Sequence, residues 1–239
     1  MTSFSSFIGL TSFLTSSSYT SISIIFYYRT MKDSLSSLIQ INKRALFTQK
    51  EIYKRIIFYL MGFLYIISFD STINYIYLTA GINGIFYLCI LNMHLFINKN
   101  QNQMLLQTLF FFLAIKLTYS ICNKYIIALL FLCSNFFLIM SPIDKLRKGI
   151  LLNNKIYFDI ENILIEITIY LLWLIYSSIE GFLCFFFICI INLFVWICML
   201  FGHQVVAGEI GTNSKIYHFL IMVFFIRNQF RNKVETSNI

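Results

Sequence analysis

Long apolar segments, separated by short polar stretches, occupy most of the chain. A helix needs roughly 20 apolar residues to cross the hydrocarbon core of a bilayer, and seven segments come close to this length. They cover residues 4–28, 52–69, 73–97, 104–122, 125–140, 160–179 and 182–201. The sequence therefore predicts an all-α, polytopic transmembrane helical bundle with about seven spans.

The first and last apolar segments differ from the others. Ser and Thr interrupt the first segment, 4–28, and their hydroxyls can bond back to helix carbonyls, which makes them acceptable in lipid. A final apolar stretch, 216–226, is too short to span. We expect it to lie in the membrane interface, within a basic tail that covers residues 204–239.

Charge along the connections predicts the orientation of the chain. Basic residues gather in the loop 29–55, between the fifth and sixth segments, and in the tail, whereas two intervening hairpins carry only Asp70 and Glu180. The positive-inside rule then places the N-terminus outside and the C-terminus inside, which requires an odd number of spans.

The loop 29–55 mixes Leu, Ile and Phe with Ser, Lys and Arg. It is either an amphipathic helix on the inner surface or a solvated basic loop.

Composition narrows the class of protein further. Of 239 residues, 59% are hydrophobic and 12% are charged, against about 25% charged residues in soluble domains. The excess of 18 Lys and Arg over 10 Asp and Glu lies in the connections. It fits membrane topology and contact with lipids better than binding of nucleic acid, which we do not expect as a partner.

Residue choice also predicts a compartment. Ile and Phe are abundant while Ala and Val are scarce, as expected from an AT-rich coding sequence of the kind found in organellar genomes and in some protist nuclear genomes. No charged residue precedes Arg29, so the N-terminal stretch lacks the basic region of a targeting signal. These features predict a multi-pass protein of the mitochondrial inner membrane that is made inside the organelle.

No motif in the sequence indicates a particular catalysed reaction. The six cysteines lie in or at the ends of apolar segments without a C-x-x-C pair, which favours packing over chemistry. The sequence contains no zinc-binding spacing, nucleophile elbow or phosphate-binding loop. We therefore expect no metal, no cofactor and no self-contained catalytic site.

Lys116 and Glu166 are the candidates for an ion path. Lys116 lies well inside an apolar run, and an ionisable residue in a membrane segment is a functional candidate by default. Its long side chain can equally extend to the nearby interface. Glu166 is the deepest acidic residue of its segment, although acidic residues also suit a helix N-terminus. A buried pair of Lys116 and Glu166 is a further hypothesis.

Histidines and asparagines offer weaker candidates. His94 and His203 lie at the inner ends of the third and seventh segments, where they would ligate a haem or serve as interfacial polar residues.

Three asparagines of the third segment are nine residues apart: Asn74, Asn83 and Asn92. Nine residues make 2.5 helical turns, so alternate members face opposite ways. Gly81 and Gly84 favour close helix packing between them. The set is either a polar stripe for a substrate or a source of interhelical hydrogen bonds.

A faint internal repeat indicates a three-plus-one-plus-three arrangement of helices, as in transporters built from parallel repeats. Two similar sets of residues each precede an acidic hairpin: Tyr59, Leu60 and Tyr65 before Asp70, and Tyr170, Leu171 and Tyr176 before Glu180.

Two families resemble parts of the chain. The run Tyr77-Leu78-Thr79-Ala80-Gly81, continued by Phe86-Tyr87-Leu88 and Met93, resembles the third helix of NADH dehydrogenase subunit 6 of complex I. Ile165-Glu166-Ile167 followed by Leu171-Leu172 resembles the last helix of that subunit. This resemblance implies a structural role beside a proton path, with other membrane subunits of a large complex as partners.

The second resemblance is to the SWEET sugar transporters, which have a three-one-three helix layout with the N-terminus outside. Ser141-Pro142-Ile143 followed by Trp173 and Tyr176 is similar to their second repeat, and Asp70 and Glu180 lie near their acidic hairpin position. Pro142 is the only proline, where that family has several, and Phe187 stands near one of its substrate-binding asparagines. This resemblance implies a carrier of small solutes.

The sequence thus leaves two main functions open. Our first expectation is a non-catalytic subunit of a respiratory-chain complex, structural or supporting proton translocation. The alternative is a SWEET-like carrier of a small solute such as a sugar, and a membrane assembly or insertion factor is a third option. A carrier would gather polar residues inside its helices, whereas a complex subunit would expose large apolar faces to partners.

Overall fold

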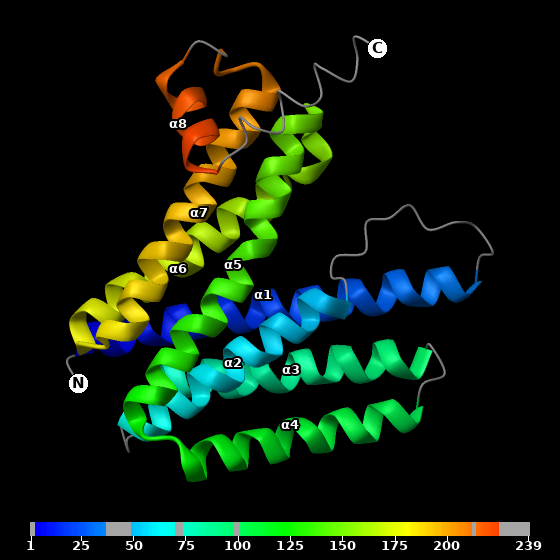
Figure 1. Cartoon of the computed structure of the whole chain (residues 1–239), viewed down its shortest axis with the longest axis vertical. Helices are drawn as coiled ribbons and strands as arrows, with labels where there is room; N and C mark the ends of the chain where they lie inside the picture. The colour runs from blue at the N-terminus through cyan, green and yellow to red at the C-terminus, as the bar shows by residue number, and fades with distance from the viewer. Residues whose placement is uncertain (1–2, 37–48, 70–73, 98–100, 212–213, 225–239) are drawn as a thin grey trace. The chain divides into compact units, whose positions relative to one another are not determined.

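The regular structure of the described chain is helical. The computed structural model describes residues 3–36, 49–69, 74–97, 101–211 and 214–224 (Figure 1). These ranges contain α1 (Ser3–Ser36), α2 (Gln49–Phe69), α3 (Tyr75–Ile97), α4 (Gln101–Ile121), α5 (Lys124–Leu152), a 3-10 turn (Lys155–Tyr157), α6 (Ile160–Glu180), α7 (Leu183–Ala207) and α8 (Lys215–Val223). The prediction of a polytopic helical bundle is confirmed.

Five of these helices, α2, α3, α5, α6 and α7, are both long enough and apolar enough to cross a membrane. The other two predicted spans correspond to α1 and α4. With 34 and 21 residues, both have the length to cross a core of roughly 30 Å at about 1.5 Å per residue. Ser and Thr dilute the apolar character of α1, and the apolar part of α4 is the shorter stretch Thr108–Ile121.

Several helices extend beyond the apolar segments that predict them. Residues 29–36 belong to α1 and residues 49–55 to α2, so both described ends of the predicted loop 29–55 are helical, and 37–48 lie outside the described residues. α5 continues through Pro142 to Leu152. Hydropathy marks where the hydrocarbon ends and not where a helix ends.

The chain divides into two compact units, Met1–Leu138 and Ile139–Ile239, and α5 passes through the division. In the first unit, α3 packs against both α1 and α2, and α4 packs against α3. In the second unit, α6 packs along α7, and α8 packs on α7. Each unit therefore contains helices held together by a central third helix, α3 or α7.

The polarity of α1 is reversed relative to a helix of a soluble protein. Its buried face consists largely of hydroxyl residues, and its exposed face carries large apolar residues such as Phe4, Phe7 and Leu14. The hydroxyls of Ser12 and Thr20 donate to backbone carbonyls four residues earlier, at 2.8 and 3.0 Å. Small side chains that satisfy themselves in this way allow close approach of a neighbouring helix in lipid.

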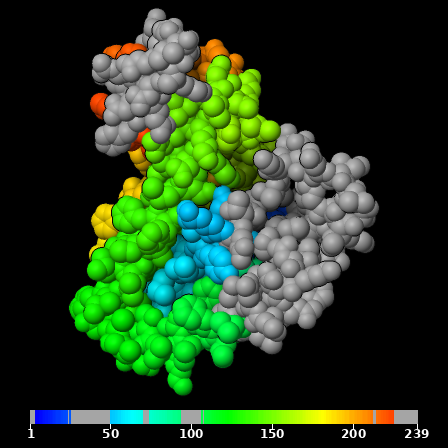
Figure 2. Space-filling model, turned by 45° about the vertical axis from the view of Figure 1, so that its right-hand side comes forward, coloured from blue at the N-terminus to red at the C-terminus, as the bar shows by residue number. Residues whose placement is uncertain are grey.

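α4 exposes apolar side chains around most of its circumference. The green surface in Figure 2 combines described residues of α4 and α5. The exposed large side chains of α4 are Leu106, Leu109, Phe110, Phe112, Leu113, Leu117, Tyr119 and Ile121. Tyr53 of α2 contacts Phe111 on the buried side, with ring centroids 6.1 Å apart. Such a surface is suited to lipid.

A glycine contact joins α2 to the first half of α5. A Cβ atom at Gly62 would lie 3.1 Å from Cε2 of Phe131. The ring of Phe131 also packs on Phe58 and Tyr65, with centroid distances of 5.3 and 5.4 Å. The absence of a side chain at Gly62 thus lets an aromatic residue approach the backbone of α2.

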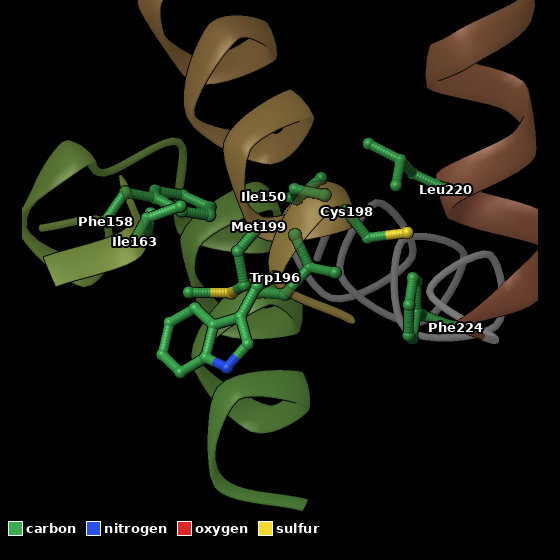
Figure 3. Close-up of a cluster of buried hydrophobic side chains, with 9 residues drawn as sticks. Ile150, Phe158, Ile163, Trp196, Cys198, Met199, Leu220 and Phe224 are labelled. Carbon is green, nitrogen blue, oxygen red and sulfur yellow. The ribbon is translucent and has the colours of Figure 1, made fainter. Parts of the chain in front are cut away.

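The core of the second unit is built around Phe158, whose ring lies against Gly149 of α5 and Gly202 of α7. Figure 3 shows the neighbouring side chains from α5, α6, α7 and α8. The buried members of this core are Leu146, Ile150, Phe158, Ile163, Trp196, Cys198, Met199, Leu220 and Phe224. Because two glycines receive one ring, the helices come closer than larger residues would allow.

The hairpin between α6 and α7 needs a glycine. Gly181 has φ 77° and ψ 20°, in the left-handed region that side chains disfavour, and its N–H bonds to the carbonyl of Ser177. At its other end, α6 begins after Asp159, whose Oδ1 accepts from the N–H of Asn162 at 3.3 Å. These caps fix the length of α6 independently of the membrane.

Replacement of Gly202 with Ala should destabilise the protein by about 1–3 kcal/mol, since overpacking of a dense core has costs of this size. A Cβ atom there would overlap Cδ1 of Leu146 and lie 2.9 Å from Cε1 of Phe158, and both side chains are buried. Thermal unfolding of the purified protein in detergent measures the effect.

Gly81→Ala in α3 is the matched control, because its Cβ would meet the ring of Phe63 at an ordinary 3.5 Å. Equal stability of the two variants would show that the contact around Phe158 does not limit packing.

Candidate functional site

Asn83 of α3 is a buried polar residue at the centre of the first unit. Its side chain is 0% exposed, and its Nδ2 donates to Oγ of Ser16 in α1 at 3.1 Å. Its Oδ1 is buried and accepts no hydrogen bond within the described part of the chain. A buried carbonyl oxygen without a donor is costly, so this atom is suited to accept a bond from water or from a solute hydroxyl.

Further hydroxyl residues are buried on the same two helices. Ser12 and Thr20 lie four residues before and after Ser16 on α1, so all three share one face. Thr79 of α3 is buried one turn before Asn83, and its hydroxyl donates to the carbonyl of Tyr75 at 2.8 Å. The interior between α1 and α3 is therefore polar but uncharged.

Two glycines flank Asn83 and face α2. A Cβ at Gly81 would lie 3.5 Å from the ring of Phe63, and one at Gly84 would lie 3.6 Å from Cβ of Tyr59. The predicted close helix packing at these glycines is therefore present, with α2 as the neighbour.

The three asparagines of α3 have three different roles. Oδ1 of Asn74 accepts from the N–H of Tyr77 at 3.0 Å, as a helix cap does. Oδ1 of Asn92 accepts from the hydroxyl of Thr108 in α4 at 3.2 Å. Asn83 and Asn92 thus face different helices, as their spacing predicts. The three asparagines do not form one polar stripe, and Asn83 remains as the candidate for contact with a solute.

In the second unit, Asn192 of α7 is the counterpart of Asn83, and the sequence analysis did not identify it. It is 2% exposed, and its Nδ2 donates to the carbonyl of Ile188 at 2.9 Å. Ser177 and Tyr176 of α6 are also buried. The ring of Trp173 packs edge-on against Tyr176 and against Phe185 of α7, with both centroid distances at 5.7 Å. An amide, a hydroxyl and aromatic rings therefore occur together in this unit.

Helix boundaries repeat between the two units. α2 and α6 each have 21 residues, and they start at 49 and 160 and end at 69 and 180, a constant offset of 111 residues. Tyr65 and Tyr176, which are both buried, have the same offset of 111 residues, and Asn83 and Asn192 are 109 apart. Carried from the tyrosines into the next helix, the offset of 111 residues places the counterpart of Asn83 at Phe194. The repeat therefore indicates Asn192 only when a shift of two residues is allowed.

The structure places the two ion-path candidates in different units. Lys116 is exposed on α4, and its backbone carbonyl accepts from the hydroxyl of Ser120 at 2.8 Å. Both interpretations of Lys116, an ion path and a side chain that extends to the interface, stay predictions. Glu166 is 4% exposed on α6 and is the one charged residue among the buried polar side chains that the structure describes. Their pairing stays a prediction.

His203 lies near the end of α7, and its ring is edge-on to Phe158 with centroids 6.3 Å apart. Its Nδ1 is buried without a hydrogen bond from the described residues. His94 belongs to α3, but its side chain lies outside the described residues, and a haem between the two histidines stays a prediction. Within the described ranges, no three His, Cys, Asp or Glu residues gather in a way that would hold a metal ion.

Comparison with known proteins identifies one relevant fold. No protein-family model and no curated protein matches the sequence. A solved structure of a eukaryotic SWEET transporter matches with a TM-score of 0.69 and 11% identity, over 86% of this chain and 100% of that chain. The chain shares the fold of this transporter.

This finding distinguishes between the two sequence resemblances. The similarity to the SWEET transporters, based on Pro142, Trp173 and Tyr176, is supported at the level of fold. The resemblance to NADH dehydrogenase subunit 6 is not supported by any comparison. Short apolar runs occur in many membrane helices, so a resemblance over such runs is weak evidence of a family.

The bond between Ser16 and Asn83 predicts coupled effects of mutation. In a double-mutant cycle of Ser16→Ala and Asn83→Ala, we expect a coupling free energy of about 0.6 kcal/mol, the average for hydrogen bonds between membrane helices. Reversible unfolding of the protein in mixed micelles, titrated with a denaturing detergent, provides the four free energies. Strictly additive effects would contradict a direct bond between α1 and α3.

Proposed function

We propose that the protein is a carrier of a small, uncharged polar solute, such as a sugar. The observation that carries this proposal is the similarity of fold to a SWEET transporter over the full length of that transporter chain. A fold alone does not define a substrate. The buried side chains of the two units supply the chemical argument.

Buried amides in equivalent helices support a solute with hydroxyl groups. Asn83 of α3 and Asn192 of α7 are each almost fully buried in their own unit. A side-chain amide offers two donors and an acceptor, which match the donor and acceptor of a hydroxyl group. The unpaired Oδ1 of Asn83 would gain a donor from such a solute.

The uncharged interior of the first unit argues against an ionic solute, and Glu166 is the one buried charged residue described in the second unit. The buried polar residues of the first unit are Ser, Thr and Asn, so they would not compensate a charge that enters lipid depth. Aromatic residues such as Trp173 and Tyr176 in the second unit are suited to contact the apolar faces of a sugar ring.

The fold comparison favours this function over our first expectation from the sequence. Membership of a respiratory-chain complex, proton translocation and a place in the mitochondrial inner membrane rest on residue composition, on the N-terminal stretch without charge and on the resemblance to NADH dehydrogenase subunit 6. No comparison supports them. A multi-pass membrane protein is what the five long apolar helices indicate. A carrier of this kind acts without catalytic residues or a cofactor.

Uptake of labelled sugars by liposomes that contain only the purified chain tests the proposal. Pentoses, hexoses and disaccharides form the panel, with empty liposomes and a labelled amino acid for comparison. We expect uptake of at least one sugar down its gradient. The absence of uptake of every sugar, together with migration of the native protein in a large respiratory assembly, would overturn the proposal.

Variants of the two asparagines test the role of the buried amides. Asn83→Leu and Asn192→Leu should each slow uptake by about tenfold, the effect of losing one hydrogen bond of about 1.4 kcal/mol. Asn92→Leu is the matched control, because Asn92 lies on the same helix as Asn83 but bonds to Thr108 of α4. An equal loss in all three variants, with intact size-exclusion profiles, would contradict a specific role for Asn83.

A further inference from the structure

The short helix α8 has two apolar faces. One face packs on the core of the second unit through Leu220 and Phe224, which lie on either side of Cys198 of α7 (Figure 3). The other face is exposed and consists of Ile216, Phe219 and Met222, at 37%, 42% and 69% exposure. Because these three residues are three apart, they form one ridge along the helix. Exposure of these three large apolar side chains to water would be unfavourable.

A ring contact shows how far α8 extends along α7. Phe219 lies edge-on to Phe194 of α7, with ring centroids 6.4 Å apart and an interplanar angle of 89°. Phe194 precedes the end of α7 at Ala207 by 13 residues, which corresponds to about 20 Å along the helix axis. α7 is long and apolar enough to span the membrane. Phe219 therefore lies level with the middle of a spanning helix.

The exposed ridge of α8 continues an exposed stripe of α7. Phe187, Ile190, Phe194 and Ile197 are exposed on α7 with helical spacing, so they form the lipid-facing side of this span. Phe194 belongs to that stripe and also contacts Phe219. The same hydrocarbon that covers the stripe of α7 is the natural partner of the ridge of α8.

Polar residues gather at the start of α8 and apolar residues follow. Ser214 caps the helix by accepting from the N–H of Tyr217 at 3.1 Å, and Lys215 and His218 are exposed in the first turn. The last turn, with Met222 and Val223, is apolar. Lys215 precedes Phe219 by four residues, or about 6 Å along the helix. Its long side chain can extend from there toward the membrane surface, and the later residues lie deeper.

The connection between α7 and α8 satisfies much of its backbone internally. Gly208, with φ 82°, lets the chain turn, and its N–H bonds to the carbonyl of Val205 at 3.1 Å. The N–H of Glu209 bonds to the carbonyl of Gln204 at 3.0 Å. A reversal of this kind allows a short helix to return along the span that precedes it.

We propose that α8 is a re-entrant helix that enters the bilayer beside α7 and contacts lipid acyl chains with Ile216, Phe219 and Met222. This differs from the position flat in the interface that the sequence predicts for 216–226, whose last two residues lie outside the described chain. The reason is that a helix lying flat at the end of α7 would not reach the level of Phe194. The inference does not depend on the proposed transport function.

Depth-dependent fluorescence quenching tests this position. Phe219→Trp and Met222→Trp are made in the full chain with Trp173 and Trp196 replaced by Phe, and the proteins are reconstituted in liposomes. Lipids brominated deep in the acyl chains should remove most of the fluorescence of both variants, and aqueous iodide should have little effect. Lys215→Trp is the matched control, and it should respond more to bromine near the headgroup and to iodide.

Two outcomes would overturn the proposal. Strong quenching of the Phe219→Trp and Met222→Trp variants by iodide or by shallow bromine alone would place α8 at the surface. Protection from every quencher would mean that another protein, such as a second copy of the chain, covers the ridge. If the tryptophan-free background fails size-exclusion analysis, the same substitutions are made with both native tryptophans present, and the quenching is taken as the difference from the parent protein.

Discussion

Lipid offers no hydrogen bonds, and the rest of this structure depends on that constraint. Polar side chains must be satisfied between helices or by their own backbone, and apolar side chains can face outward without cost. α1 shows this most clearly, because Ser12, Ser16 and Thr20 are buried and Phe4 and Phe7 are exposed. The hydroxyl face allows close packing on α3, and it places Ser16 where Asn83 needs a partner. The polar residues of the interior are therefore buried because the surrounding lipid offers them no hydrogen bonds.

The internal repeat places buried polar side chains at similar positions in both units, where the same constraint applies to them. Two units with second helices of equal length each place a tyrosine on the second helix and a buried asparagine on the third, at offsets of 111 and 109 residues. Buried amides also form hydrogen bonds between the helices of membrane proteins without any solute, as the bond from Asn83 to Ser16 does. In the proposed carrier, the pair would in addition offer bonds to a polar solute, which must exchange its hydrogen bonds with water for bonds inside the protein.

Much of the fold could be predicted from the sequence, because apolar runs of span length leave few alternatives to helices. The tyrosine repeat and the similarity of Pro142, Trp173 and Tyr176 to the SWEET transporters also indicated the observed fold. The site was harder to predict. Asn192 lies in a strongly apolar helix and carries no local motif, so only the repeat register points to it, and only when a shift of two residues is allowed. The predicted span 125–140 does not give the end of α5, which continues past Pro142, because hydropathy does not detect helix beyond the hydrocarbon.

The central claim is that this chain alone carries a solute by a mechanism that alternates between the two sides of a membrane. Counterflow measures this most directly. Liposomes containing the purified chain are loaded with a high concentration of unlabelled sugar and diluted into a trace of the labelled sugar. A carrier will transiently accumulate label above its external concentration, because the outward movement of unlabelled sugar returns binding sites for the label. Simple equilibration, or no entry of label for any sugar of the panel, would contradict the account.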